Sequence, residues 1–296
     1  MDAAVHSPNR WIVGARPRTL PAAIVPVAVG AACAAGVGDP RWWRGLLALV
    51  VSLALQVGVN YANDYSDGIR GTDDVRVGPV RLVASGLAKP KAVKAAAFTA
   101  FGAAAVAGLG LAIVTSWWLL VVGLAALLAA WFYTGGPKPY GYLGLGELFV
   151  FVFFGLVATV GTTYAITERI TGASVVMGCG VGALACALLV VNSLRDIPTD
   201  SVVGKKTLAV RLGDARTRWL YAGLAVSALV AAAVVAVAWR PWAAIALLTV
   251  PLAIVPIRIV RGGAKGRELI AVLGATGRLQ MAYGLVAAVG LILSRG

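Results

Sequence analysis

The chain has 296 residues, of which 60% are hydrophobic and only 13% are charged, about half the charged share of a typical soluble protein. With a mean hydropathy of +0.87, too few polar residues remain to cover a globule of this size, which excludes a water-soluble fold with a sizeable soluble domain. The 26 Lys and Arg against 12 Asp and Glu give a net charge of +14. In so apolar a chain, we attribute this excess to loops that orient membrane helices and contact anionic lipid, and not to a nucleic-acid partner.

Nine apolar runs follow one another along the chain, separated by polar or Gly- and Pro-rich segments. They cover residues 19–37, 45–61, 95–114, 117–133, 145–167, 173–191, 219–239, 242–257 and 279–293. A membrane-spanning helix needs about 20 apolar residues. The pattern therefore predicts an all-α integral membrane protein with nine transmembrane helices, forming a single domain over residues 1–296 that begins with a cytoplasmic segment, residues 1–18.

The basic residues predict the orientation of these helices. Of the 26 Lys and Arg, 21 fall in alternate segments beginning with the N-terminal one, and five fall in the others. Because Lys and Arg in short loops stay on the cytoplasmic side, we expect the N-terminus in the cytoplasm and the C-terminus outside the cell membrane. Among the acidic residues, Asp39 and Glu168 alone fall on the predicted outer side.

A first acidic cluster follows the second apolar run. Asn60, Asp64 and Asp67 stand at i, i+4 and i+7, a spacing that puts an amide and two carboxylates on one face of a helix end. Such groups near a membrane repel one another unless a cation neutralises them, and they indicate a functional site. The alternative is a solvated cap at the end of a spanning helix. Asp73 and Asp74 follow in the next loop.

A second cluster follows the sixth run and opens with the same Asn-x-x-x-Asp spacing. Its polar residues are Asn192, Arg195, Asp196, Asp200, Lys205 and Lys206. Because Pro198 is expected to interrupt the helix, we predict that Asp196 and Asp200 lie where the helix ends and the chain turns. An Asp-Pro turn followed by a basic, orienting loop is the alternative.

The ligand types of the two clusters point to magnesium. Hard oxygen donors beside many basic residues suit Mg²⁺ bound together with a diphosphate. The single histidine, His6, lies in the N-terminal tail, and the three cysteines lie in apolar runs, which argues against imidazole or thiolate ligands. Four carboxylates and a diphosphate would balance two Mg²⁺ ions and several basic side chains. The predicted metal ligands are Asp64, Asp67, Asp196 and Asp200, with Asp73 as an alternative.

At these residues the chain resembles the UbiA superfamily of intramembrane prenyltransferases over nearly its whole length. That family has nine helices around a membrane-facing cavity and two Asp-rich motifs that hold Mg²⁺-bound prenyl diphosphate. Asn60 and Asp64 match the first motif, and Asn192, Asp196 and Asp200 match the second. The wording of segments 16–21, 63–73 and 204–208 resembles the menaquinone branch, the 1,4-dihydroxy-2-naphthoate polyprenyltransferases.

The first motif departs from the superfamily pattern at one position. The second Asp of the motif is expected four residues after Asp64, and this position is Gly68. Asp67 is the nearest substitute, although Asp73 or Asp74 could reach the metal if the loop folds back.

The resemblance implies a reaction and a set of residue roles. A polyprenyl group would pass from its diphosphate to dihydroxynaphthoate, with loss of CO₂ and diphosphate, in a cavity open to the cytoplasm and laterally to lipid. The implied catalytic residues are Asp64, Asp67, Asp196, Asp200 and Lys138. The implied diphosphate contacts are Asn60, Asn63, Arg70, Asn192, Arg195, Lys205 and Lys206, and the implied acceptor contacts are Arg18, Tyr133 and Lys138.

Two alternatives remain at this point. A related prenyltransferase would use another aromatic acceptor, such as 4-hydroxybenzoate. A transporter of an anionic lipid or metabolite would also explain the membrane helices and the basic residues, but not why acidic residues cluster beside them at two similarly spaced motifs.

Overall fold

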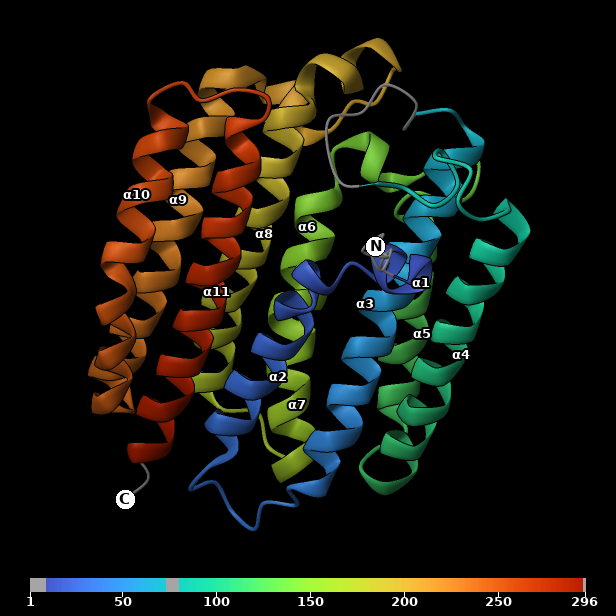
Figure 1. The fold of residues 1–296 in the computed structure, drawn as a ribbon. Helices are drawn as coiled ribbons and strands as arrows, with labels where there is room; N and C mark the ends of the chain where they lie inside the picture. The colour runs from blue at the N-terminus through green and yellow to red at the C-terminus, as the bar shows by residue number, and fades with distance from the viewer. Residues whose placement is uncertain (1–8, 73–79, 295–296) are drawn as a thin grey trace, which may run out of the picture.

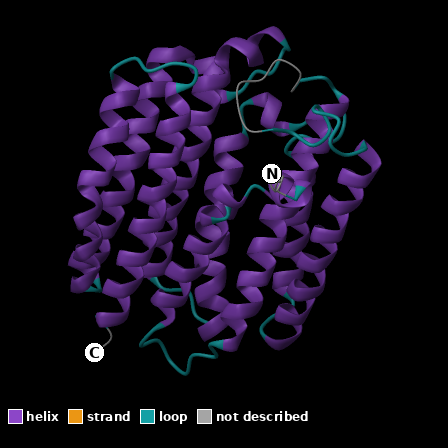
Figure 2. Ribbon diagram, in the orientation of Figure 1, coloured by secondary structure: helices purple, strands orange, loops and turns teal. Residues whose placement is uncertain are grey.

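The computed structural model describes residues 9–72 and 80–294, and the regular structure within these ranges is entirely helical (Figures 1 and 2). In chain order the elements are α1 (Arg10–Ala15), η1 (Pro17–Thr19), α2 (Pro21–Ala34), α3 (Trp43–Ile69), α4 (Pro90–Val114), α5 (Trp118–Phe132), η2 (Tyr140–Leu143), α6 (Gly146–Val150), η3 (Phe151–Val157), α7 (Ala158–Thr167), α8 (Gly172–Val202), α9 (Leu208–Ala238), η4 (Pro241–Thr249), α10 (Val250–Arg261) and α11 (Glu268–Leu293). The element η3 is π-helical and joins α6 to α7 without a break.

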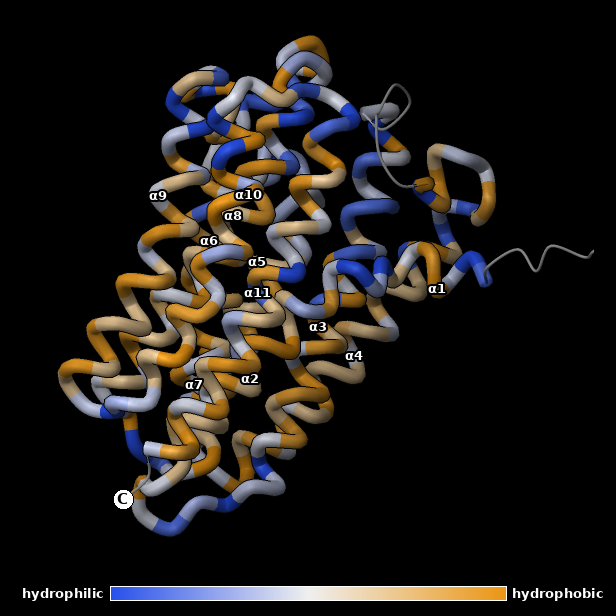
Figure 3. The backbone as a smooth tube through the Cα atoms, turned by 60° about the vertical axis from the view of Figure 1, so that its left-hand side comes forward, coloured by the Kyte–Doolittle hydropathy of each residue, from blue (hydrophilic) through white to orange (hydrophobic). Residues whose placement is uncertain are grey.

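Seven helical segments in the described ranges are long and apolar enough to cross a membrane, namely α3, α4, α6 to α7, α8, α9, η4 to α10 and α11. The segment from α1 through η1 forms an eighth candidate with α2 if the pair, bent by 48°, is one broken span. Figure 3 shows that hydrophobic residues predominate along the middle of the bundle and that hydrophilic residues gather at its upper end. The chain is therefore an all-helical, multi-pass membrane protein, whereas the count of nine spans stays a prediction.

Two of the predicted spans are shorter in the structure than a membrane requires. Pro17 and Pro21 each occupy the first position of a new helix, which suits a residue without an N–H and separates α1 from α2. Helix α5 has 15 residues and stops before the Thr134 to Pro137 segment, in which two glycines and a proline end it. Both short helices border the cavity described below.

The expected helix break at Pro198 is wrong. Helix α8 continues unbroken through Pro198 to Val202. Proline removes one N–H donor close to the helix end, where hydroxyl groups bind the carbonyls of the last turns: Thr199 Oγ1 donates to the Asp196 carbonyl at 3.0 Å, and Ser201 Oγ donates to the Ile197 carbonyl at 2.7 Å. Asp196 and Asp200 therefore lie one turn apart on the same helix, and not in a turn.

The bundle has two packing groups. Helix α8 is its central helix and packs against α2, α9, α11 and η3, with Met177, Val181 and Tyr283 in one buried cluster. The approach to η3 is close, because a Cβ on Gly155 would lie 2.6 Å from the Gly182 Cα, as small residues allow between membrane helices. The second group joins α3 to α4 and α5 around Phe101.

A buried arginine ties three helices together at the end of the bundle opposite the acidic clusters. The Arg44 side chain is 1% exposed. Its guanidinium donates to the carbonyl of Ala165 at 3.2 Å, to Glu168 Oε1 at 2.7 Å and to the carbonyl of Val114. The last carbonyls of α4 and α7, which have no partner within their own helices, are thus satisfied by a cation from α3.

Replacing Arg44 with Gln is expected to destabilise the fold by about 1–3 kcal/mol, because buried carbonyls lose a charged donor. The hydrogen bond from Arg44 lowers the pKa of the exposed Glu168 carboxyl, so this contact stabilises the fold above the ordinary pKa of the carboxyl and is lost as the pH falls through the lowered pKa. Thermal unfolding in detergent at neutral and acidic pH measures both effects. Arg41→Gln, at an arginine 57% exposed and 3.8 Å from the same carboxylate, should leave the melting temperature unchanged.

Candidate active site

A cavity of about 1220 Å³ lies inside the bundle. Its walls come from α2, α3, α4, α5, η3, α7, α8 and α11, and most of the lining side chains are apolar. Many of the polar and charged lining side chains lie near the ends of α3 and α8. Others come from η2 and from the turn between α8 and α9. The cavity therefore combines a charged end with apolar walls.

Asp67, near the end of α3, is the carboxylate of the first cluster that lines the cavity. It is 5% exposed, and its Oδ1 accepts hydrogen bonds from the Tyr142 hydroxyl at 2.6 Å and from Lys205 Nζ at 3.3 Å. Burial alone would lower the pKa of Lys205, but the charge on Asp67, with smaller contributions from Tyr142 and Asp200, outweighs it and raises the pKa. Lys205 is therefore a cation at neutral pH, at the charged end of the cavity.

Helix α8 brings the second cluster to the same end of the cavity. Arg195 donates through Nε to Asp196 Oδ1 at 2.7 Å and through Nη2 to Asp196 Oδ2 at 2.8 Å, a bidentate pair. The same Nη2 donates to Asn192 Oδ1 at 2.8 Å. Asp200 follows one turn later, and all four residues line the cavity. Asp67 of the first cluster and Asp196 and Asp200 of the second thus face one space.

Asp64 has a different environment from the one expected of a metal ligand. It is fully buried and is absent from the residues that line the cavity. Its two oxygens accept hydrogen bonds from the backbone N–H groups of Leu82 and Val83, each at 2.9 Å. The carboxylate thus holds the loop between α3 and α4 against α3.

The amides of the first cluster line the cavity from α3. Asn60 Nδ2 donates to the Ala15 carbonyl at 2.8 Å and to Thr19 Oγ1 at 2.9 Å, so it also fastens the break between α1 and α2. Asn63 Oδ1 accepts a hydrogen bond from Thr134 Oγ1 at 2.8 Å.

Three predicted basic contacts lie outside the cavity lining. Arg70 donates to the carbonyls of Thr134 and Gly136, and its guanidinium lies 5.5 Å from the centre of the Tyr142 ring, so it positions the segment between α5 and α6. Lys138 and Lys206 are exposed. Asp73 lies outside the described residues.

Two predicted acceptor contacts do line the cavity. Arg18 lies on η1, and Tyr133 follows α5. The Tyr133 ring lies 5.5 Å from that of Tyr140, which stacks on Phe149 at 4.0 Å. Aromatic rings therefore cover the wall between α5 and α6.

The carboxylates that line the cavity suit a divalent cation only in part. In the described ranges, no three Asp, Glu, His or Cys side chains are close enough together to hold a metal ion by themselves. Mg²⁺ commonly binds through one or two carboxylates together with substrate phosphates and water. Asp67, Asp196 and Asp200, which line the cavity together with a cationic Lys205, fit that mode of binding.

The family is shown by a match over most of the chain. The UbiA prenyltransferase family matches residues 23–274. The chain belongs to the UbiA prenyltransferase family. The resemblance noted in the motifs is thereby confirmed.

Two relatives of this family member have the same name. A Mycobacterium tuberculosis protein named 1,4-dihydroxy-2-naphthoate octaprenyltransferase is 54% identical to it, over 94% of this chain and 95% of that protein. An Escherichia coli protein of the same name is 35% identical, over 77% of each chain.

Solved structures of UbiA homologs share the fold. The apo structure of the homolog from Aeropyrum pernix has a TM-score of 0.70 at 15% identity and covers 92% of this chain and 97% of that one. The homolog from Archaeoglobus fulgidus bound to GPP and Mg²⁺ has a TM-score of 0.63 at 16% identity and covers 95% of this chain and 100% of that one. The all-helical membrane architecture predicted for this UbiA family member is therefore confirmed.

Several lining residues of this UbiA family member escaped the sequence analysis. Tyr142 contacts both Asp67 and Lys205, but its segment carries no charge pattern that would single it out. The ninth apolar run, residues 279–293, predicts that Arg278 lies in a loop, whereas α11 begins at Glu268. The apolar residues that precede Arg278, namely Leu269, Ile270, Val272 and Leu273, are the signal that could have placed it on a helix. Arg16 and Arg81 also line the cavity.

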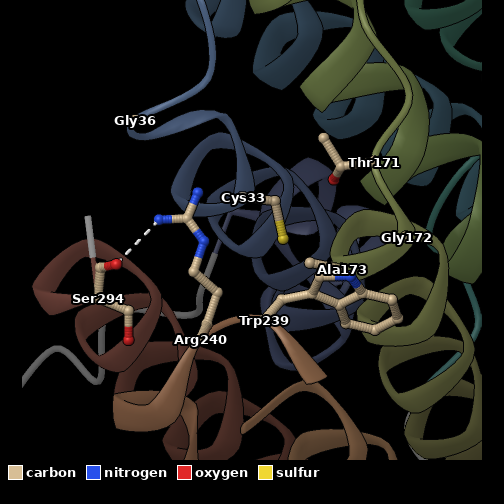
Figure 4. A pocket seen from close by; sticks show the side chains of 8 residues that line it. All are labelled: Cys33, Gly36, Thr171, Gly172, Ala173, Trp239, Arg240 and Ser294. Atoms are coloured by element: carbon tan, nitrogen blue, oxygen red, sulfur yellow. Dashed lines mark hydrogen bonds between the residues drawn. The ribbon is translucent and has the colours of Figure 1, made fainter. Parts of the chain in front are cut away.

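A smaller cavity of about 400 Å³ lies at the opposite end of the bundle, between the ends of α2 and α9 and the start of α8 (Figure 4). Arg240 lines it and donates to the Ser294 carbonyl at 3.2 Å and to the Ala35 carbonyl at 2.8 Å. These bonds tie the end of α11 to the end of α2. We therefore assign Arg240 a structural role.

Proposed function

We propose that the protein transfers a polyprenyl group from a polyprenyl diphosphate to 1,4-dihydroxy-2-naphthoate, giving demethylmenaquinol in menaquinone biosynthesis. The observation that carries this proposal is the 54% identity, over nearly the full length of both chains, to a protein of that name. The charged end and apolar walls of the cavity support it, because the donor carries a diphosphate on a long hydrocarbon chain.

The cavity residues would bind the donor at the charged end. Asp67, Asp196 and Asp200 would hold Mg²⁺, in our proposal two ions, which when bound neutralise the diphosphate and lower the barrier to its departure. Lys205 would contact the diphosphate oxygens and stabilise the negative charge that develops on the leaving group. Asn63 and Asn192 would donate hydrogen bonds at the same end. The apolar walls would hold the prenyl chain and exclude water.

The bond changes of the transfer balance without a further reactant. The bond between the prenyl C1 and the diphosphate oxygen breaks, and its electron pair leaves with diphosphate. In attack by the ring carbon that bears the carboxylate, this carbon, made electron-rich by the hydroxyls, forms a bond to C1. The bond from the ring to the carboxyl carbon then breaks, its electron pair restores the aromatic ring, and CO₂ leaves.

A turnover assay tests the proposal directly. Purified protein is given Mg²⁺, a polyprenyl diphosphate and either carboxyl-labelled dihydroxynaphthoate or 4-hydroxybenzoate. We expect prenylated naphthalenediol, diphosphate and labelled CO₂. Preference for 4-hydroxybenzoate, or a product that retains the label, would assign the protein to another acceptor, and uptake of the anionic substrates into vesicles without product would favour a transporter.

We also propose nine membrane crossings in one domain over residues 1–296, with the acidic clusters at the cytoplasmic end. The 21-to-5 distribution of Lys and Arg supports this orientation. The expected result is that a reporter active only in the cytoplasm is silent when fused after Gly296 and active when fused before Met1. Activity of the C-terminal fusion would require an even number of spans.

A further inference from the structure

We propose that Arg278 on α11, together with Arg16 at the break between α1 and α2, binds the carboxylate of the aromatic acceptor. This inference rests on the proposed function and assigns its acceptor subsite. The two residues come from opposite ends of the chain, and each lines the same cavity. Arg16 immediately precedes η1, and α11 packs against η1 and α2, so the two residues lie at neighbouring elements.

Arg278 is a cation on a membrane-spanning helix, and its exposed side chain lines the cavity. It lies ten residues after the first residue of α11, Glu268, and makes no hydrogen bond or ion pair with another residue in ranges 9–72 and 80–294. Ionisable side chains in membrane-spanning helices usually face a polar cavity and mark binding sites, and a cation there suits an anionic ligand. The guanidinium folds back along the helix, since a Cβ on Gly274 would lie 3.7 Å from its Nη1.

Arg16 provides a second and independent observation. It adopts a left-handed backbone conformation, with φ 52° and ψ 70°, which is unfavourable for a residue with a side chain and often occurs at binding sites. Its Nη2 atom is buried and has no hydrogen-bond partner among the residues that the structure describes. The rest of the side chain is half-buried and lines the cavity, where an anionic ligand would pair with the guanidinium.

The depth of Arg278 favours the acceptor over the diphosphate. Helices α8 and α11 run antiparallel: Leu194 packs in the same buried cluster as Leu269, while a Cβ on Gly180 would lie 2.7 Å from the Tyr283 hydroxyl. Arg278 falls between these two levels, beside the part of α8 that precedes Leu194. It therefore lies deeper in the cavity than the Asp196 pair.

That placement fits the geometry of the transfer. The diphosphate is held at the level of Asp196, and the prenyl C1 extends from it toward the apolar walls. The acceptor ring must contact C1, so its carboxylate lies beyond the charged end. An anion there, surrounded by apolar side chains, needs a cation, and Arg278 and Arg16 supply two planar donors suited to a carboxylate.

Equilibrium binding to purified protein tests the assignment without turnover. We compare the wild type with Arg278→Gln, using dihydroxynaphthoate and 1,4-dihydroxynaphthalene, which lacks the carboxylate. The variant should weaken binding of the carboxylate on the order of 10- to 100-fold and leave binding of the naphthalenediol unchanged. Arg278→Lys should restore part of the loss. Arg216→Gln removes the same charge from an exposed position on α9 outside the cavity and should change neither affinity.

Steady-state kinetics provide a second readout. For Arg278→Gln, the KM of the acceptor should rise while the KM of the polyprenyl diphosphate stays as in the wild type. An equal loss for both aromatic ligands would show a structural role, and a raised KM for the diphosphate would place Arg278 at the donor; either result overturns the assignment. If the wild type transfers nothing to dihydroxynaphthoate, the proposed function fails, and the binding comparison still decides whether Arg278 recognises a carboxylate.

Discussion

Replacing Asp67 with Asn is expected to lower the rate of prenyl transfer by about 100-fold or more. The substitution keeps the shape of the side chain but removes the carboxylate that lines the cavity beside Lys205. With the charge gone, the site loses a proposed Mg²⁺ ligand and the group that raises the pKa of Lys205. Turnover should recover in part at high Mg²⁺ concentration, because weaker metal binding can be compensated by mass action.

Tyr142→Phe is the matched control for Asp67. It removes the hydroxyl that donates to Asp67 at 2.6 Å and leaves the carboxylate in place. We expect a loss of less than about tenfold, as for a single hydrogen bond. A normal rate for Asp67→Asn, measured as diphosphate release from a labelled donor, would mean that the second ligand of the first cluster lies elsewhere, with Asp64 or Asp73 as the remaining candidates.

Asp196→Asn is expected to reduce turnover by about 100-fold or more for the same reason. The substitution also leaves Arg195, which is 6% exposed, without its bidentate carboxylate. Because an unpaired buried charge is costly, a decrease in melting temperature should accompany the lost rate. Activity assays and thermal unfolding in detergent measure the two effects separately.

A second arginine–aspartate pair, outside the cavity, provides a control for the Arg195–Asp196 pair. Arg218 donates through Nε and Nη2 to both oxygens of Asp214, at 2.5 and 2.8 Å, and neither residue lines the cavity. Asp214→Asn should therefore lower the melting temperature and leave the rate per folded molecule unchanged. Equal losses of activity for the two variants would show that Asp196 acts through stability alone.

The helical architecture could be predicted from the sequence because apolar runs between basic loops have few other solutions in a membrane. The ends of the helices could not. Hydropathy falls where a helix leaves the lipid, but α3 continues past the predicted end at residue 61 to Ile69, and α11 begins at Glu268, before its predicted start. The extra turns of α3 are polar, with Asn63 and Asp67 lining the cavity, and the same polarity suggests a loop in the sequence.

The residue types of the site could be predicted from the sequence, but the directions in which their side chains point could not. The spacing of Asn60, Asp64 and Asp67 predicts a shared helical face, and all three do lie on α3. It does not indicate that the loop between α3 and α4 returns to place the N–H groups of Leu82 and Val83 against Asp64. Long-range backbone contacts of this kind leave no periodic signal.

The π-helical segment η3 has a consequence for the hydrocarbon chain of the donor. In the wider turn of a π-helix, residues four apart lie nearly in line along the helix axis. Residues at this spacing line the cavity, namely Phe149, Phe153, Val157 and Gly161. The rings of Phe149 and Phe153 stack on each other. These four residues thus give the cavity a nearly straight apolar strip. Each isoprene unit that packs against this strip is stabilised by about the same free energy of apolar burial. Units that extend past its end are not stabilised further by contacts with the protein. Such a wall binds a prenyl chain without selecting its length.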